Sequence, residues 1–556
     1  MTRYLPILVV LFIFSCKSNV NSDEARTPIS ESETVIDNTK TDDDLSAIST
    51  KDFREFKVLD SKLITKAEIW QTINPLMEDF KEADYNRLKP MVLESDMMTL
   101  QKHIADGKFN YEQLTKFYLY RIRKFDREND LSLNSVISIN PNVINEAKEK
   151  DDNANNLGHP IYGMPILLKD NINAANMVTT AGAAALKDNK TDDAFLTKQL
   201  KSKGALILGK ANLSEWAYFF CGDCPSGYSA IGGQTLNPYG RRIIDTGGSS
   251  SGSGVSVSAN FAAAAIGSET SGSILSPASS NSVVGLKPTI GLVSRSGVVP
   301  ISSTLDTAGP MTKTVMDNAI LLDAIFGPDT SDSKTIDARL DNGFYYEKLK
   351  NASLKGKRFG APKRLLQDTL FVEALDVLKK QGAIIVEIEE EELGLPNFLR
   401  LLNLDMKKDL PSYMESYANK DIPMRTIEDF MAYNLKDSLT SMPYGQNLFK
   451  GISDDKGDAQ FLERIQDTLK LNGQQFFDKP MRSQKLDAFL SINNYHAGFA
   501  AVAEYPALTV PMGYQDNGRP MGLTFISGRL QEKFLLEWAY VYEQASKERI
   551  APKDYN

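Results

Sequence analysis

Two Gly/Ser-rich stretches, GGSSSGSG at residues 247–254 and GSETSGSI at residues 267–274, lie on either side of the apolar segment 255–266. A flexible linker is the simplest interpretation of Gly/Ser-rich sequence. The apolar segment argues against a linker, because both stretches then flank an element with the composition of a protein core. Glycine lets backbone N–H groups approach a ligand closely, and such N–H groups can stabilise an oxyanion. We therefore predict that the two stretches form a catalytic site with a serine nucleophile.

Nucleotide-binding loops are also glycine-rich, but neither of their usual patterns is present. The sequence has no GxxxxGK(S/T), and no GxGxxG that follows a strand and precedes an acidic residue about twenty positions on. The chain has 556 residues and a net charge of -9, without a long Lys/Arg run. It therefore lacks the basic surface that nucleic-acid binding requires, and we expect no nucleic-acid partner.

A serine nucleophile needs a base, and histidine is scarce in this chain. Only His103, His159 and His496 are present, which disfavours a Ser-His-Asp hydrolase and a histidine-rich metal site. Lysine is the alternative base. Lys169 ends the apolar run 165–168, and burial there would lower its pKa enough for it to accept a proton. A lysine that points into solvent from the end of a strand is the competing interpretation.

Strands and helices are predicted to alternate along most of the chain. Strand-like apolar runs occur at 135–139, 165–168, 205–208 and 383–388, and helical spacing occurs at 111–122, 195–203 and 371–381. This alternation predicts an α/β fold. Residues 395–485 are more polar and less regular, and we expect a largely helical insertion or lid there.

The N-terminus predicts export. Residues 1–16 combine a positive start, an apolar run too short to span a bilayer, and a small residue before Cys16, as in a bacterial lipoprotein signal. We expect a lipid on Cys16 and a location on a bacterial membrane facing the periplasm; a plain signal peptide is the alternative. Residues 17–51 predict a disordered polar tether. An N-terminal helical segment at 52–95 and a main domain at 96–550 follow.

Cys221 and Cys224 form a close pair, and in an exported protein such a pair is a possible disulfide. Two reduced cysteines that simply pack together, or a thioredoxin-like redox motif, are the alternatives. A zinc site would need two further ligands, and none lies nearby in the sequence. We therefore predict no metal at this position.

The two Gly/Ser-rich stretches belong to a longer series of motifs that resembles the amidase signature family, in particular its peptide amidase branch. The motifs are GMPILLKDNI at 163–172, LGKANLSEWA at 208–217, GGSS at 247–250, ETSGSI at 269–274, GLKPT at 285–289, DTAGP at 306–310, YPALTVP at 505–511 and PMGLTFI at 520–526. They occur in the family's order and cover about residues 95–550. The resemblance implies a large, mixed, twisted β-sheet covered by helices on both faces.

The resemblance also implies a role for individual residues. Ser273 corresponds to the nucleophile, Ser249 to the bridging serine and Lys169 to the base, and the separation 273 − 249 = 24 matches the family. The family holds its bridging serine after a cis peptide, which is Gly248–Ser249 here. The implied oxyanion hole consists of the backbone N–H groups of Thr270, Ser271, Gly272 and Ser273.

Four positions depart from the common family pattern. Glu269 replaces an aspartate and Leu275 replaces an arginine, as occurs in the peptide amidase branch, whereas Ser271 stands where that branch usually has aspartate. Ser251 replaces a glycine. None of these changes removes a member of the triad, but the missing arginine alters the charge beside the nucleophile and leaves the choice of substrate open.

The resemblance implies an amidase that forms a covalent acyl-enzyme without a metal or organic cofactor. Its expected substrates are small primary or secondary amides and amidated peptide C-termini, and no obligate partner subunits are expected. Two alternatives stay open. A glutaminase-type subunit of an amidotransferase is a cytosolic role, against which the export signal argues. A catalytically silent binding protein is disfavoured by the intact triad.

Overall fold

The computed structural model describes residues 56–127, 130–153, 158–335 and 345–556, which all belong to one compact unit, Thr41–Asn556. The predicted signal peptide, Cys16 and the tether at 17–51 lie outside the described residues. Within the described ranges, no helix is both long enough and apolar enough to cross a bilayer.

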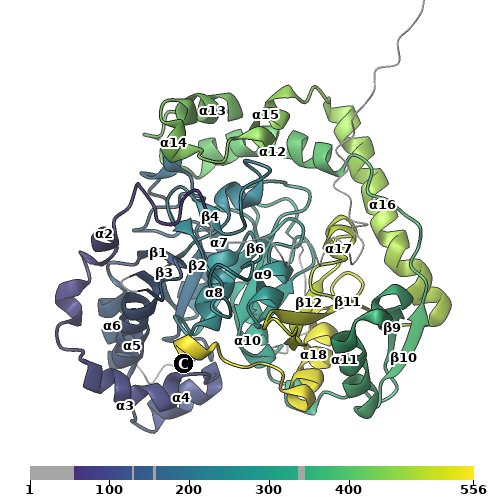
Figure 1. The fold of residues 1–556 in the computed structure, drawn as a ribbon, viewed down its shortest axis with the longest axis horizontal. Coiled ribbons are helices and arrows are strands. Elements are labelled where there is room, and N and C mark those ends of the chain that lie inside the picture. The colour runs from purple at the N-terminus through teal and green to yellow at the C-terminus, as the bar shows by residue number, and fades with distance from the viewer. Residues whose placement is uncertain (1–55, 128–129, 154–157, 336–344) are drawn as a thin grey trace, which may run out of the picture. The chain divides into compact units, whose positions relative to one another are not determined.

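An 11-stranded sheet forms the centre of the unit (Figure 1), with the strand order β1-β3-β2-β6-β8-β7-β12-β13-β11-β9-β10. Its strands are β1 (Val136–Ile139), β2 (Pro165–Lys169), β3 (Leu206–Ala211), β6 (Ala264–Glu269), β7 (Val284–Lys287), β8 (Thr307–Thr312), β9 (Arg358–Pro362), β10 (Ile384–Ile388), β11 (Ala488–Ile492), β12 (Ala507–Tyr514) and β13 (Pro520–Ile526). The sheet is mixed: β2 runs parallel to β3 and β6, whereas β8, β7 and β12 pair antiparallel. A separate two-stranded sheet contains β4 (Tyr228–Ser229) and β5 (Gly233–Gln234).

Helices cover both faces of the large sheet, as strand β8 illustrates. The side chain of Met311 lies against Gly254 on one face, whereas the hydroxyl of the adjacent Thr312 accepts a hydrogen bond from Asn318 on the other. This confirms the predicted α/β fold. The helices outside the lid are α2 (Lys66–Trp70), α3 (Glu82–Val92), α4 (Met97–Ala105), α5 (Tyr111–Ile122), α6 (Val143–Asp152), α7 (Phe195–Ser202), α8 (Ser251–Ser258), α9 (Leu275–Ser280), α10 (Val315–Ile325), α11 (Thr369–Lys380), α17 (Ala497–Val502) and α18 (Glu532–Ser546).

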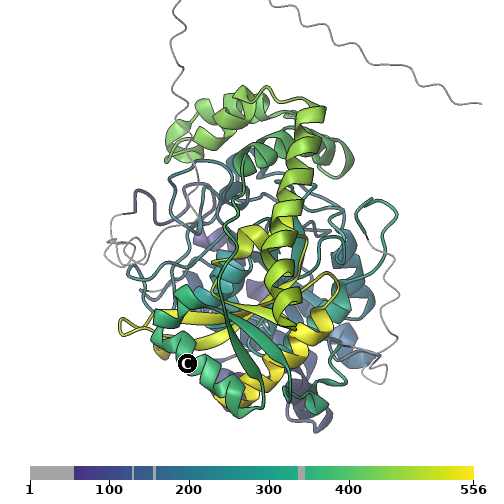
Figure 2. The same cartoon turned by 90° about the vertical axis from the view of Figure 1, so that its right-hand side faces the viewer.

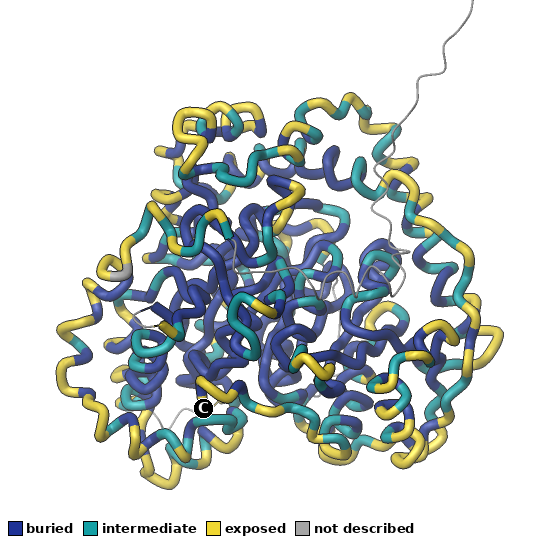
Figure 3. The backbone as a smooth tube through the Cα atoms, in the orientation of Figure 1, coloured by how far each residue is buried: buried dark blue, intermediate teal, exposed yellow. Residues whose placement is uncertain are grey.

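Residues 251–254 of the first Gly/Ser-rich stretch begin helix α8, every residue of which is buried. Glycine and serine have low helix propensity, so packing must stabilise this helix. A Cβ at Gly252 would lie 2.5 Å from backbone atoms of Asn212 and Ser135, a distance that only glycine permits. Figure 3 shows this central region as the most completely buried part of the molecule.

Residues 395–485 are largely helical, as the sequence predicts. They contain α12 (Phe398–Ser416), α13 (Ile427–Leu435), α14 (Ser438–Ser441), α15 (Asn447–Asp454) and α16 (Ala459–Gln484). Figures 1 and 2 show that these helices, which we call the lid, gather along one edge of the sheet, with α16 descending towards β11. The lid has a hydrophobic cluster with the segment around Trp216 and Cys221, separate from the core of the sheet.

Candidate active site

Lys169 is the last residue of β2, and its side chain is completely buried. Its Nζ lies 2.8 Å from the Oγ of Ser249, 2.9 Å from the Oγ of Ser268 and 3.0 Å from the carbonyl oxygen of Ser268. Burial lowers the pKa of Lys169 to about 7, although the carboxylates of Asp306 and Glu269 oppose this shift. A lysine with this pKa is often neutral near pH 7 and can accept a proton. The observed burial excludes the solvent-exposed lysine that the sequence left open.

Ser249 lies in a tight turn before α8 and is fully buried. Gly247 has a φ of +64°, and the Gly248–Ser249 peptide is cis, as the family resemblance implies. A Cβ at Gly247 would lie 2.8 Å from the backbone of Pro277, so the turn admits no larger residue there. The carbonyl oxygen of Ser249 accepts a hydrogen bond of 3.0 Å from the N–H of Ser214. The turn therefore holds the Ser249 hydroxyl against Lys169.

Ser273 lies in the turn between β6 and α9 and is partly exposed. The buried carboxylate of Glu269 fixes this turn. It accepts hydrogen bonds of 2.7 Å from the N–H of Gly272, 2.7 Å from that of Ile274 and 3.0 Å from that of Leu275. The carbonyl oxygen of Ser273 accepts a bond of 3.2 Å from the N–H of Ser250. Glu269 thus stabilises the turn and leaves the Ser273 hydroxyl without a hydrogen bond in the described part of the chain.

The N–H groups expected to form the oxyanion hole are not equivalent. The N–H of Gly272 is directed to Glu269 and so has a protein acceptor. Within the described residues, no hydrogen bond occupies the N–H groups of Thr270, Ser271 and Ser273. These three groups are therefore the available donors for a developing oxyanion.

Asp306 is a site residue to which the sequence analysis gave no role, although it lies in the DTAGP motif. It is buried, and its carboxylate accepts hydrogen bonds of 2.6 Å from the hydroxyl of Thr270 and of 2.8 and 2.9 Å from the N–H groups of Ile301 and Ser302. Burial raises the pKa of Asp306. Its contact with Thr270 orients the first residue of the nucleophile turn, and its charge helps to balance Lys169.

A cavity of about 290 Å³ adjoins Asp306 on the side of the lid. Its lining includes Val298 and Pro300 together with Tyr413 of α12 and Tyr417, which directly follows that helix. The cavity therefore lies between the lid and the loop that fixes the Asp306 carboxylate. It offers space for part of a ligand close to the nucleophile turn.

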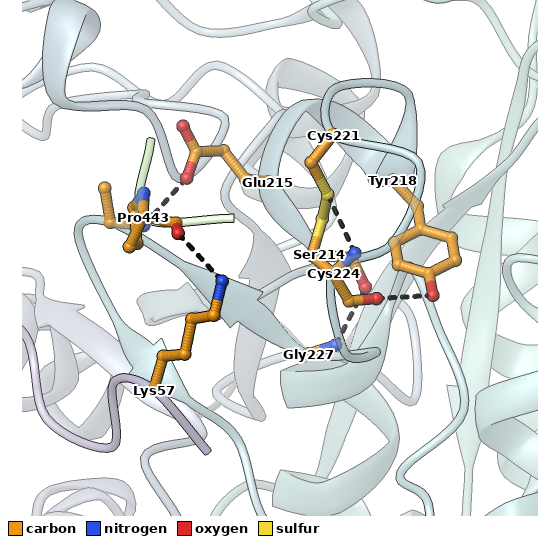
Figure 4. Close-up of a disulfide and its surroundings, with 9 residues drawn as sticks. Lys57, Ser214, Glu215, Tyr218, Cys221, Cys224, Gly227 and Pro443 are labelled. Carbon is orange, nitrogen blue, oxygen red and sulfur yellow. Dashed lines mark hydrogen bonds between the residues drawn. A yellow bond between two sulfur atoms is a disulfide. The ribbon is translucent and has the colours of Figure 1, made fainter. Parts of the chain in front are cut away.

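Cys221 and Cys224 are joined by a disulfide, with their Cα atoms 5.9 Å apart (Figure 4). The three residues 216–218 before the disulfide all have positive φ values, between 52° and 78°. The hydroxyl of Tyr218 donates a hydrogen bond of 2.8 Å to the carbonyl oxygen of Cys224, which links the two ends of this loop. The disulfide thus closes a small ring within a loop whose backbone is unusually constrained.

The disulfide loop connects the lid to the turn of Ser249. On the lid side, the carbonyl oxygen of Phe220 accepts a hydrogen bond of 3.0 Å from the N–H of Leu448, and the ring of Trp216 contacts Phe430 and Phe449 at centroid distances of 5.0 and 5.4 Å. On the other side, Ser214 bonds to Ser249. The loop therefore forms part of the boundary between the lid and the candidate site.

Ser491, which was not predicted as a site residue from the sequence, also has a base beside it. The Oγ of Ser491 lies 2.6 Å from the Nδ1 of His496, and the Nε2 of His496 lies 2.5 Å from a carboxylate oxygen of Glu390. Ser491 and His496 are buried. Arg364 forms an ion pair with Glu390 at the surface. Among the described residues, no group of three or more His, Cys, Asp or Glu side chains could hold a metal ion.

A buried lysine in contact with one serine, beside a partly exposed serine in a fixed turn, is the arrangement of a serine-type hydrolase. The sequence profile of the Amidase family matches residues 113–491. A "Probable amidase" of Arabidopsis thaliana is 35% identical over 483 residues, which are 83% of this chain and 92% of that protein. The chain therefore belongs to the amidase family, and like its relatives it is an amide-hydrolysing enzyme.

Further relatives and solved structures agree with this assignment. An amidase family protein from Bacillus anthracis is 37% identical with a TM-score of 0.85, over 89% of this chain and all of that one. The peptide amidase of Stenotrophomonas maltophilia is 39% identical with a TM-score of 0.78, over 83% of this chain and 99% of that one. A component of the glutamyl-tRNA(Gln) amidotransferase of Halorhodospira halophila is 30% identical, over 79% of this chain and 95% of that protein.

Proposed function

We propose that the protein hydrolyses carboxamides through a triad of Ser273, Ser249 and Lys169, with Ser273 as the nucleophile. The distance of 2.8 Å between Lys169 Nζ and Ser249 Oγ, in a buried environment that lowers the lysine pKa to about 7, is the observation that carries this proposal. A neutral lysine and a neighbouring serine can together act as the base that a histidine provides in other serine hydrolases.

The mechanism is a proton relay coupled to acyl transfer. Neutral Lys169 takes the proton of Ser249 as Ser249 takes the proton of Ser273, whose oxygen attacks the amide carbon. The free N–H groups of the nucleophile turn bind the oxyanion. The proton returns through Ser249 to the leaving nitrogen as the C–N bond breaks, which releases ammonia or a small amine. Water then attacks the acyl-enzyme, gives its proton to the same relay and releases the acid.

The substrates that we propose are neutral amides, including amidated peptide C-termini. The peptide amidase among the structural relatives supports this class. Leu275 also supports it: this buried residue stands where the common family pattern has arginine, so that no guanidinium is available at this position to pair with an acidic substrate. No metal or organic cofactor is required by the proposed steps.

We further propose that the enzyme acts outside the cytoplasm, held to a bacterial membrane by a lipid on Cys16. This proposal rests on the sequence of residues 1–16, with residues 17–51 as the tether. Cys16→Ala should move the protein from the detergent phase to the aqueous phase in a detergent phase separation. A wild-type protein that is already aqueous would contradict the lipid anchor.

A glutaminase component of an amidotransferase is the second candidate, because the amidotransferase relative matches most of the chain. That role requires partner proteins, whereas we propose a protein that acts alone. Affinity purification of the full chain from its own host tests this point. Co-purification of stoichiometric partners, with glutamine as the preferred amide, would favour the amidotransferase role.

Ammonia release from a panel of amides tests the proposed function directly. The panel should contain simple aliphatic amides, amino acid amides, amidated peptides and glutamine. We expect turnover of at least one neutral amide, and trapping of an acyl group on Ser273 by mass spectrometry at short times. Turnover without an acyl group on Ser273, or no turnover of any amide, would contradict the proposal.

A further inference from the structure

Asn494 lies directly beside the nucleophile turn, although the two are far apart in sequence. A Cβ placed on Gly272 would lie 3.0 Å from the side-chain nitrogen of Asn494 and 3.5 Å from its Cβ. Gly272 immediately precedes Ser273. Asn494 is partly exposed, and its side-chain amide has no hydrogen bond within the described part of the chain. An unpaired amide group therefore faces the residue next to the proposed nucleophile.

The backbone on the N-terminal side of Asn494 is held rigidly. Asn493 has a φ of +49°. Its N–H donates a hydrogen bond of 2.8 Å to the carbonyl oxygen of Gly522 in β13, and its side-chain oxygen accepts one of 2.8 Å from the N–H of Gly522. A left-handed asparagine with both groups paired to the same strand residue leaves this position little freedom to move.

The backbone on the C-terminal side is held by His496. Burial lowers the pKa of His496, although the neighbouring carboxylate of Glu390 opposes this shift. The Nδ1 of His496 lies 2.6 Å from the Ser491 hydroxyl, and its Nε2 lies 2.5 Å from Glu390 and 3.0 Å from the guanidinium of Arg364. The same chain of hydrogen bonds ties residue 496 to β11 and to the end of β10.

The loop is thus fixed on both sides of Asn494, whose side-chain amide makes no hydrogen bond within the described residues. A structural asparagine in a folded protein normally pairs its side chain, as Asn493 does. Preorganised polar groups that lack a partner beside a reacting centre are typical of substrate recognition. The side-chain amide of Asn494 carries two donors and one acceptor, which matches a peptide bond, with its one N–H and one C=O.

We propose that Asn494 determines specificity by binding the amide group that precedes the scissile carboxamide, so that the preferred substrates are N-acylated amino acid amides and peptide amides. This inference rests on the proposed function of Ser273. In such a substrate a single Cα separates the two amide groups, so the preceding amide lies next to the scissile carbonyl, as Asn494 lies next to the nucleophile turn. A simple amide with the same side chain lacks this group and gains nothing from Asn494.

Two substrates that differ only in this group test the inference. N-acetyl-L-phenylalaninamide and 3-phenylpropanamide share the aromatic side chain and the ammonia leaving group. In the wild-type enzyme we expect a higher kcat/KM for the acylated amide. Asn494→Leu, which keeps the size of the side chain, should lower kcat/KM for the acylated amide by about 10- to 100-fold. For 3-phenylpropanamide we expect a change of less than about threefold.

Asn472→Leu is the matched control. Asn472 is partly exposed, but its side chain already donates a hydrogen bond of 3.0 Å to the carbonyl oxygen of Gly394. We expect the same substrate preference as in the wild type. If Asn494→Leu fails to fold, as judged by circular dichroism, Asn494→Ser provides the same comparison with a smaller side chain.

The possible outcomes separate the two proposals. Equal losses for both substrates in the Asn494 variants would show that Asn494 merely supports the nucleophile turn, and would overturn the inference. An unchanged preference would overturn it as well. A wild-type enzyme that hydrolyses other amides but does not favour the acylated substrate over 3-phenylpropanamide would overturn the inference alone. A wild-type enzyme that hydrolyses no amide would overturn the proposed function together with it.

Discussion

Ser273 and Ser491 differ in the property that matters for catalysis. Ser491 has a histidine and a carboxylate in line, with distances of 2.6 and 2.5 Å. In the proposed relay Ser273 depends on Ser249, whose hydroxyl contacts Lys169 at 2.8 Å. Yet Ser491 is fully buried within β11, which pairs with β13, whereas Ser273 is partly exposed in a turn with free N–H donors.

The comparison shows that a chain of hydrogen bonds is not sufficient evidence of a catalytic triad. A nucleophile must be accessible to its substrate, and N–H donors must be positioned to bind the oxyanion. The Ser491 hydroxyl lies inside the sheet, where no amide could reach it. We therefore propose that His496 and Glu390 hold the loop around Asn494, and that the accessible Ser273 is the nucleophile.

The largest effect should come from the accessible serine. Ser273→Ala removes the nucleophile and should lower kcat by roughly 10⁴- to 10⁶-fold, as in other serine hydrolases. The turn should remain intact, because Glu269 stabilises it through backbone N–H groups that the substitution does not alter. Ammonia release and the thermal midpoint Tm, measured on the same preparation, check both expectations. Activity within tenfold of wild type would mean that Ser273 is not the nucleophile.

Lys169→Met should produce the next largest loss. It removes the proposed base while retaining the length of the side chain, and we expect kcat to fall by about 10²- to 10⁴-fold. Although Lys169→Met should lower activity, it should raise the stability of the folded protein. The folded-state pKa of about 7 lies below the ordinary value of 10.5, so the unfolded chain binds more protons between these values. Removing the buried amine should therefore raise Tm at pH 8, a readout that does not depend on activity.

Much of this site could be predicted from the sequence, because its motifs specify local structure. Lys169 ends a short apolar run that forms β2, and Ser249 and Ser273 lie in turns rich in glycine, as expected. The helical nature of the lid also agrees with its sequence. Helix α8 was not predicted, because its glycines and serines have low helix propensity and only close packing against Asn212 stabilises the helix.

Contacts between distant residues could not be predicted. The pairing of Asp306 with Thr270, the approach of Asn494 to Gly272 and the hydrogen bonds of His496 all depend on how strands are ordered in the sheet. That order places β11 many strands from β6, and no local pattern reveals it. Because histidine is scarce in the sequence, lysine was predicted as the base. Nothing in the sequence indicated the contacts that His496 makes with Ser491 and Glu390.

The pH dependence of turnover tests whether the reaction requires a neutral base with the pKa of the buried Lys169. Because burial lowers the pKa of Lys169 to about 7, the neutral and active form is lost as pH falls below 7. We expect kcat to decrease about tenfold per pH unit between pH 6.5 and 5, and to level off above pH 8. Pre-steady-state acylation rates provide the measurement when a later step limits turnover. A rate independent of pH over this range would contradict a lysine base.

The disulfide at the lid should have a smaller effect. A ring closed by neighbouring cysteines gains little from loop entropy, so the double variant Cys221→Ser/Cys224→Ser should lower Tm only slightly. Because the loop joins Leu448 of the lid to the segment before Ser249, we expect a change in KM of about two- to tenfold. Non-reducing mass spectrometry of the wild-type protein isolated from its host should show the oxidised pair. Two free thiols there would contradict the disulfide and weaken the argument for export.

The smallest effect on the chemistry should come from the buried serine. Ser491→Ala removes the hydroxyl that lies 2.6 Å from Nδ1 of His496, which should cost about 1–2 kcal/mol of stability for one buried hydrogen bond. Turnover of 3-phenylpropanamide should remain within about tenfold of wild type, because neither the triad nor the N–H donors contact Ser491. Preference for the acylated amide should fall more than this, since the loop that carries Asn494 loses one of its attachments. A loss as large as that of Ser273→Ala, in a variant that is still folded, would mean that the serine beside the histidine takes part in the reaction, and the functional distinction between the two serines would fail.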